Sequence, residues 1–226
     1  METFSPEFFV ALGSIIVLDL ALAGDNAVVI AMAANRLQAA ARRKAILIGT
    51  VGAVVIRLAL TCVAVWLLTI PYLQFIGGLI LLPIAVHLLA PSDDTADVKA
   101  ADNLWGAIKT ILIADATMSL DNVLSIAGAA NGHFGLVVIG LMISIPIVVA
   151  GSTLIGKLMD RFPVIMYVGA AIIGWTSGKM MLEDGALGAH ILQLTGGFAH
   201  ALPAVLAVGV CVLGWLLARR AQQRTA

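Results

Sequence analysis

Four aspartates lie inside long apolar stretches of this chain, in two copies of one motif. Residues 19–35 read DLALAGDNAVVIAMAAN and residues 115–131 read DATMSLDNVLSIAGAAN, with 8 identities over 17 positions. Each copy has an Asp, five further residues, and then an Asp-Asn pair. A charged side chain in the centre of a bilayer costs about 2.5–3.5 kcal/mol on insertion scales, so such residues mark functional sites. The repeated motif therefore predicts a site.

The oxygen atoms of this motif are the ligands that hard divalent cations prefer. The predicted metal ligands are Asp19, Asp25, Asn26, Asp115, Asp121 and Asn122. Carboxylate and amide oxygens suit Mg²⁺, Ca²⁺ or Mn²⁺, whereas zinc and copper favour His or Cys, and neither motif contains one. Four carboxylates exceed the charge of one dication, so the remainder must be protonated or paired, and exchange against protons follows naturally. Interhelical hydrogen bonds are an equally good interpretation of the two Asn residues.

The spacing of the two aspartates in each copy prevents a straight helix from placing both on one ion. At 1.5 Å and 100° per residue, Asp19 and Asp25 differ by about 9 Å in depth and point about 120° apart. A break in the helix would remove this obstacle, and Gly24 is a suitable place because glycine weakens a helix interior. The second copy has Leu120 at the equivalent position. The sequence thus offers a break at Gly24 in the first copy and favours a continuous helix in the second, and inversion of the repeats is the other solution.

The composition is that of a polytopic membrane protein. Of 226 residues, 61% are hydrophobic and 12% are charged, and the mean hydropathy is +1.06. Soluble domains are about 45–50% apolar and about 25% charged. The net charge of zero gives no electrostatic footprint for nucleic acid. No nucleophile with a base, cofactor motif or phosphate loop is visible, so neither an enzyme nor a bound cofactor is expected.

Seven segments are long enough to cross a bilayer. They are residues 8–34, 45–69, 72–90, 104–130, 134–156, 163–182 and 199–218. The motif occurs in the first and fourth, and Pro71 and Gly77 of the third align with Pro163 and Gly169 of the sixth. The sequence thus predicts one transmembrane domain over 1–226, with repeat one at 8–90, a polar cytoplasmic loop at 91–103, repeat two at 104–183 and a seventh helix at 199–218. Because each repeat has three spans, the second copy is inverted relative to the first. The predicted fold is an all-α membrane protein of seven transmembrane helices, two inverted three-helix repeats plus a C-terminal helix.

The basic residues predict the orientation, since cytoplasmic loops carry an excess of Lys and Arg. Eleven of the 13 fall in or beside the odd-numbered loops or after the last span: Arg36, Arg42, Arg43, Lys44, Lys99, Lys109, Lys157, Arg161, Arg219, Arg220 and Arg224. We therefore expect the N-terminus outside and the C-terminus in the cytoplasm.

Inversion also predicts how the aspartates pair. The first span descends while the fourth rises, so Asp19 should lie level with Asp121, and Asp25 level with Asp115. Arg57, in the middle of the second span, is predicted to be a counter-ion of this cluster, or else a structural tether. Gly174 and Gly178 form a small-xxx-small pattern that favours close helix packing, within the chain or between chains.

Two D-x(5)-D-N motifs three spans apart, with an Arg in the second span, resemble the TerC family of integral membrane proteins. The short chain with seven predicted spans, and the segment SLDNVLSIAGAAN in its second motif copy, resemble the YjbE-like branch of this family. The resemblance covers residues 8–183 and implies a bacterial plasma membrane protein associated with manganese export, and in some members with tellurite resistance. It also implies kinship with the LysE-type exporter superfamily. The chain departs from longer TerC proteins at Asn122, where serine is frequent, and at Ala23-Gly24, where Ser-Leu is frequent.

The leading hypothesis is a secondary transporter that exports a divalent cation, Mn²⁺ above all, in exchange for protons. Its expected partners are the lipid bilayer and the metal ion, and a homo-oligomer is left open. An alternative is an exporter of a cationic amino acid or another small solute, whose ammonium group the carboxylates would bind. A further alternative is a factor that assists membrane-protein assembly.

Overall fold

The computed structural model describes residues 6–67, 70–89, 100–130 and 133–225, and this part of the chain is almost entirely helical. The helices are α1 (Pro6–Leu22), α2 (Gly24–Ala34), α3 (Ala39–Cys62), α4 (Ala64–Leu67), α5 (Leu73–Leu89), α6 (Ala100–Ala130), α7 (Phe134–Arg161), α8 (Val164–Glu183), α9 (Gly188–Thr195), the 3₁₀ helix η1 (Gly196–Ala201) and α10 (Leu202–Thr225). The described residues of every predicted span are largely helical: the first span comprises α1 and α2, the second α3 and α4, and the seventh the end of η1 and most of α10. The predicted loop at 91–103 ends later than the structure has it, because α6 already begins at Ala100. Residues 90–99, which include most of this loop, lie outside the described residues.

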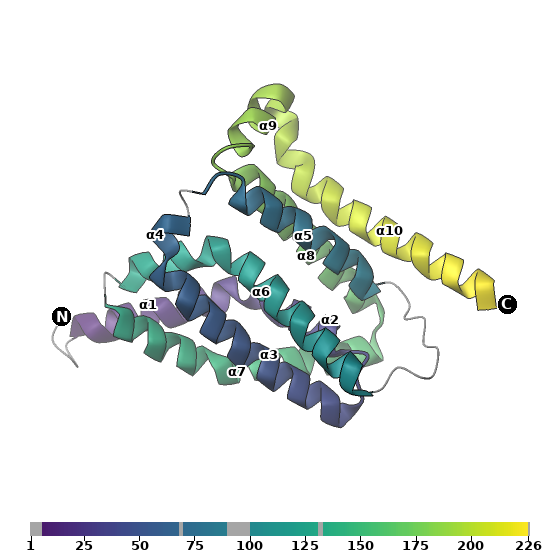
Figure 1. Ribbon diagram of the computed structural model, residues 1–226, viewed down its shortest axis with the longest axis horizontal. Helices are drawn as coiled ribbons and strands as arrows, with labels where there is room; N and C mark the ends of the chain where they lie inside the picture. The colour runs from purple at the N-terminus through teal and green to yellow at the C-terminus, as the bar shows by residue number, and fades with distance from the viewer. Residues whose placement is uncertain (1–5, 68–69, 90–99, 131–132, 226) are drawn as a thin grey trace.

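The helices form one bundle with two groups (Figure 1). In one group α3 packs along α6 and α1 along α7, and in the other α5, α8 and α10 pack together. Helix α2 contacts α6, α7 and α8 and so joins the groups. Buried aliphatic side chains fill the joints, among them Ile30, Ile46 and Ile111 in one cluster and Leu81 and Ile173 in another.

The first span is broken at the place where the sequence offers a break. Helices α1 and α2 meet at Ala23 with a bend of 48°, and Gly24 is the first residue of α2. Helix α6 carries the second copy of the motif and runs without interruption through Leu120. The two copies therefore differ in backbone shape at the position where one has glycine and the other leucine.

Several helices have the length and apolarity of a membrane span. Helices α3, α7 and α8 and residues 199–220 qualify individually, the bent pair α1–α2 qualifies as one broken span, and α5 is a shorter apolar helix. Large apolar side chains such as Val55, Leu154 and Val208 are more than half exposed on the outside of the bundle. An apolar exterior of this extent belongs in lipid rather than in water.

The glycine pair of α8 packs against α10 within the same chain. A Cβ on Gly178 would lie 2.5 Å from the Cα of Pro203, and a Cβ on Gly174 would lie 2.9 Å from the Cα of Ala207. The atoms in the way are backbone, which cannot move aside as a flexible side chain can. The small-xxx-small pattern is therefore used for contact within the chain.

Replacing Gly178 with Ala is expected to destabilise the protein by about 1–3 kcal/mol, the usual cost of forcing an extra carbon into a packed joint. The measurement is thermal unfolding of the purified protein in detergent. Gly151→Ala in α7 is the matched control, because a Cβ there meets no atom within 4 Å. Equal melting temperatures for the two variants would contradict the close α8–α10 contact.

Basic residues tie several helix ends together at one end of the bundle. Arg42, near the start of α3, forms a 2.6 Å ion pair with Asp160 at the end of α7. Arg36, just after α2, donates to the backbone oxygen of Leu88 at the end of α5. The ends of α2, α5 and α7 and the start of α3 thus lie together.

Candidate functional site

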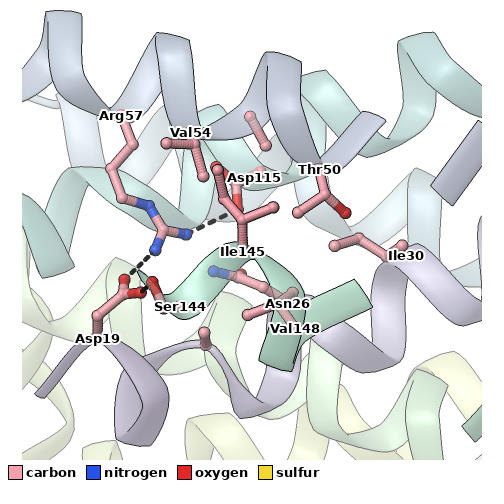
Figure 2. Close-up of a pocket in the computed structure, with 12 residues that line it drawn as sticks. Asp19, Asn26, Ile30, Thr50, Val54, Arg57, Asp115, Ser144, Ile145 and Val148 are labelled. Atoms are coloured by element: carbon pink, nitrogen blue, oxygen red, sulfur yellow. Dashed lines mark hydrogen bonds and ion pairs between the residues drawn. The ribbon is translucent and has the colours of Figure 1, made fainter. Parts of the chain in front are cut away.

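A buried arginine joins the first aspartates of the two motif copies (Figure 2). The guanidinium of Arg57 on α3 forms an ion pair with Asp19 on α1 through Nη1, and a 2.7 Å ion pair with Asp115 on α6 through Nη2. The three residues are between 2% and 4% exposed. Residues 96 positions apart in sequence, and equivalent in the repeat, are therefore held on one cation.

Close packing of α3 against α6 brings Arg57 to this position. Gly49 and Gly52 lie on the face of α3 that meets α6, and a Cβ on either would lie 2.8 Å from the side chain of Ile111 or Leu112. The missing side chains let the two helix axes approach closely. Arg57 lies further along α3 and reaches both carboxylates.

Two serines complete the hydrogen bonds of the carboxylates. Ser119 donates to Asp115 over 3.1 Å and accepts a 3.0 Å hydrogen bond from Nε of Arg57. Ser144 on α7 donates to the other oxygen of Asp19. Sequence reasoning missed both residues, although Ser119 had a signal, since it lies four positions after Asp115 and so on the same helix face. Ser144 is a buried polar residue in an otherwise apolar span, which is a weaker signal.

A small cavity opens beside these ion pairs. Its volume is about 20 Å³, and its lining includes Asp19, Asn26, Thr50, Arg57 and Asp115 together with apolar side chains such as Ile30. A cavity of this size holds about one water molecule or a bare ion of similar radius. Figure 2 shows Thr50 on the side away from Asp19, near Ile30, and Asn26 between them with its amide nitrogen toward Ser144.

Two polar groups that line the cavity lack a hydrogen-bond partner. Within the described residues, the side-chain amide nitrogen and oxygen of Asn26 and the hydroxyl of Thr50 are buried and have no hydrogen-bond partner. Each of these residues is 2% exposed. Buried polar atoms are hydrogen-bonded in the great majority of cases, so unbonded ones beside a cavity indicate a polar occupant such as water or an ion.

The remaining predicted ligands lie elsewhere. Asp25 accepts a 3.2 Å hydrogen bond from Thr176 on α8, and Asn122 donates to the backbone oxygen of Leu22 over 3.4 Å. Asp121 belongs to α6, but its side chain lies outside the described residues. In the part of the chain that the structure describes, no three His, Cys, Asp or Glu residues gather in the manner of a metal site. Of the predicted aspartates, Asp19 and Asp115 therefore line the cavity, and Asp25 lies at the contact between α2 and α8.

The observed arrangement differs from the predicted aspartate pairing. The sequence predicts Asp25 opposite Asp115, whereas Asp115 binds Arg57 and Ser119, and Asp25 bonds to α8. The structure instead brings together Asp19 and Asp115, the two equivalent positions. The predicted pair of Asp19 with Asp121 stays a prediction.

A charged, hydrogen-bonded site enclosed by helices with an apolar exterior defines a polytopic α-helical membrane protein. The comparisons with known proteins agree. The chain belongs to the TerC family of integral membrane proteins, whose family model matches residues 4–223.

Relatives with similar sequences carry membrane-protein names. The chain is 44% identical to the uncharacterized membrane protein YjbE of Bacillus subtilis (strain 168), over 83% of this chain and 86% of YjbE. It is 27% identical to the uncharacterized membrane protein YkoY of the same organism, over 71% of this chain and 56% of YkoY. It is 24% identical to the inner membrane protein YgdQ of Escherichia coli (strain K12), over 79% of this chain and 83% of YgdQ. No solved structure matches the chain.

Proposed function

We propose that this protein is a secondary transporter that exports a divalent metal cation, Mn²⁺ above all, from the bacterial cytoplasm in exchange for protons. Asp19 and Asp115 form the central site, and Asn26 contributes an amide oxygen. Asp25 and Asn122 are further ligands along the motif helices, and Asp121 is a ligand on the sequence motif alone. The observation that carries the proposal is the meeting of two equivalent buried carboxylates, one from each half of the chain, at one cavity.

Charge supports a dication as substrate. Two carboxylates neutralise one dication completely, and an uncompensated charge in a low-dielectric interior is costly. The dication therefore binds when the guanidinium of Arg57 releases the carboxylates, so that Arg57 acts as the counter-ion of the empty site. Hard oxygen ligands without His or Cys favour Mn²⁺ over Zn²⁺.

The size of the cavity argues against the alternative substrate. In the arrangement with Arg57 between the aspartates, the volume of about 20 Å³ has room for one ion or one water molecule and not for an amino acid. A role in membrane-protein assembly would give no reason for an arginine held between two aspartates at a buried cavity. Transport of a metal ion accounts for both the small cavity and the buried arginine between two aspartates.

The proposed topology has seven spans and two inverted repeats, with the N-terminus outside and the C-terminus in the cytoplasm. If the two repeats are exchanged, α3 takes the place of α7, α6 that of α1, and α5 that of α8. The α3–α6 contact then becomes the α7–α1 contact, and the α5–α8 contact becomes itself. This symmetry of the helix packing supports the repeats. The basic contacts of Arg36 and Arg42 at one end of the bundle support a cytoplasmic assignment for that end.

Inside-out membrane vesicles loaded with a metal-sensitive dye test the proposal. Vesicles that contain the protein are expected to take up Mn²⁺ faster than vesicles without it, with Zn²⁺ uptake at the level of the protein-free control. Ca²⁺ and Mg²⁺ complete the panel and rank the hard cations. Equal uptake of all four ions with and without the protein would exclude the proposed transport.

A further inference from the structure

The cavity carries an unbalanced charge while Arg57 holds the two aspartates. Asp19 and Asp115 contribute two negative charges and Arg57 one positive charge, which leaves a net charge of −1 in a site between 2% and 4% exposed. One monovalent cation, either a proton or a metal ion, brings this site to neutrality. A dication would leave it at +1, and a water molecule would leave it at −1.

The unbonded oxygens of the cavity provide ligands for such a cation. Asn26 and Thr50 both line the cavity, and the side-chain oxygen of each has no hydrogen-bond partner among the described residues. Asp115 lines the same cavity and adds a carboxylate. Neutral and anionic oxygens in this combination are typical ligands of a small, hard cation.

We infer that the cavity binds one Na⁺ ion through Asn26, Thr50 and Asp115 while Arg57 remains between the two aspartates. The volume of about 20 Å³ has room for one ion that has shed its water shell, and the oxygen ligands suit a hard cation such as Na⁺. Na⁺ binding itself needs no metal transport. A role of Na⁺ in exchange, in place of the proton, rests on the proposed function: Na⁺ neutralises the site with Arg57 in place, and the exported dication neutralises it once the guanidinium of Arg57 has moved away from the two carboxylates.

Thermal unfolding of the purified full chain in detergent tests Na⁺ binding. Binding to the native state raises the melting temperature. We expect a saturable rise with NaCl that equal concentrations of choline chloride and KCl do not produce. Thr50→Val, which removes the hydroxyl and keeps the shape, is expected to abolish the Na⁺-specific rise. Thr50→Ser is expected to restore it.

Ser152→Ala is the matched control. Ser152 is also a buried hydroxyl without a partner, but it does not line the cavity, so this variant should retain the full Na⁺ response. Equal melting temperatures in NaCl, KCl and choline chloride would overturn the inference, as would equal Na⁺ responses of Thr50→Val and Ser152→Ala. If Thr50→Val does not fold, ²²Na⁺ binding to the parent protein decides. Displacement by unlabelled Na⁺ and not by K⁺ supports the site, and absence of bound ²²Na⁺ contradicts it.

The two proposals fail separately. Mn²⁺ uptake by the parent protein in dye-loaded vesicles, combined with no Na⁺-specific stabilisation, would remove the Na⁺ site and leave metal export standing. Na⁺-specific stabilisation without uptake of any divalent cation would remove metal export and leave the Na⁺ site.

Discussion

The Arg57→Met variant is expected to lose about 3–5 kcal/mol of stability, because removing one partner of a buried ion pair leaves uncompensated charge behind. Methionine keeps much of the aliphatic stem of arginine, so most packing is retained. We further expect Mn²⁺ to restore stability to this variant and to raise its melting temperature more than that of the parent protein. The reason is that the dication then binds Asp19 and Asp115 without competition from the guanidinium.

Arg42→Met controls for the loss of an arginine as such. Arg42 pairs with Asp160, whose side chain is 49% exposed, and pairs of this kind contribute about 0–1 kcal/mol. Thermal unfolding with and without Mn²⁺ compares the variants. An Arg57→Met protein as stable as Arg42→Met, with no larger response to Mn²⁺, would show that Arg57 does not act as the counter-ion of the carboxylates.

Asp19→Asn and Asp115→Asn are each expected to lower the initial rate of Mn²⁺ uptake at low metal concentration by about 100-fold or more. Asparagine keeps the size of the side chain and removes its charge, and losing one partner of a buried charge pair costs about 3–5 kcal/mol, where 1.4 kcal/mol is tenfold. The two effects should be similar in size, because both carboxylates contact Arg57 and line the same cavity. Dye-loaded inside-out vesicles give the rates.

Asp160→Asn is the matched control for these two variants, since it removes an ion-paired carboxylate at the helix ends, away from the cavity. Its uptake rate should stay within about twofold of the parent rate, as expected for an exposed pair worth at most about 1 kcal/mol that takes no part in binding. Parent-like rates for Asp19→Asn and Asp115→Asn would place the transport route elsewhere in the protein.

The helices and the break in the first span follow from local properties of the sequence. Long apolar segments predict spans because every backbone polar group in lipid must be satisfied within the segment, and a helix does this locally. Gly24 marks a suitable place for the break because glycine is a poor helix former, and Leu120 favours the unbroken α6 for the opposite reason. Charge and repetition likewise single out Asp19, Asp115 and Arg57.

The detailed contacts of the site depend on packing that one sequence does not reveal. The predicted levels of the aspartates in the membrane assume that α1 and α2 form one straight helix. In the structure the 48° bend at Ala23 redirects α2, and Asp25 bonds to Thr176 on α8. Thr50 and Ser144 become site residues only because α3 and α7 pack beside Asp19 and Asp115. Polar residues of this kind also bond to their own helix, so their type alone does not distinguish the two roles.

The binding of Mn²⁺ to the purified protein tests most directly whether two carboxylates from the two halves of the chain hold one cation. Free Mn²⁺ has a strong electron paramagnetic resonance signal, and titration of protein with Mn²⁺ gives the number of ions bound per chain. We predict one saturable site of this kind in the parent protein and its loss in the Asp19→Asn/Asp115→Asn double variant. A folded double variant that binds Mn²⁺ as the parent does would contradict the central claim.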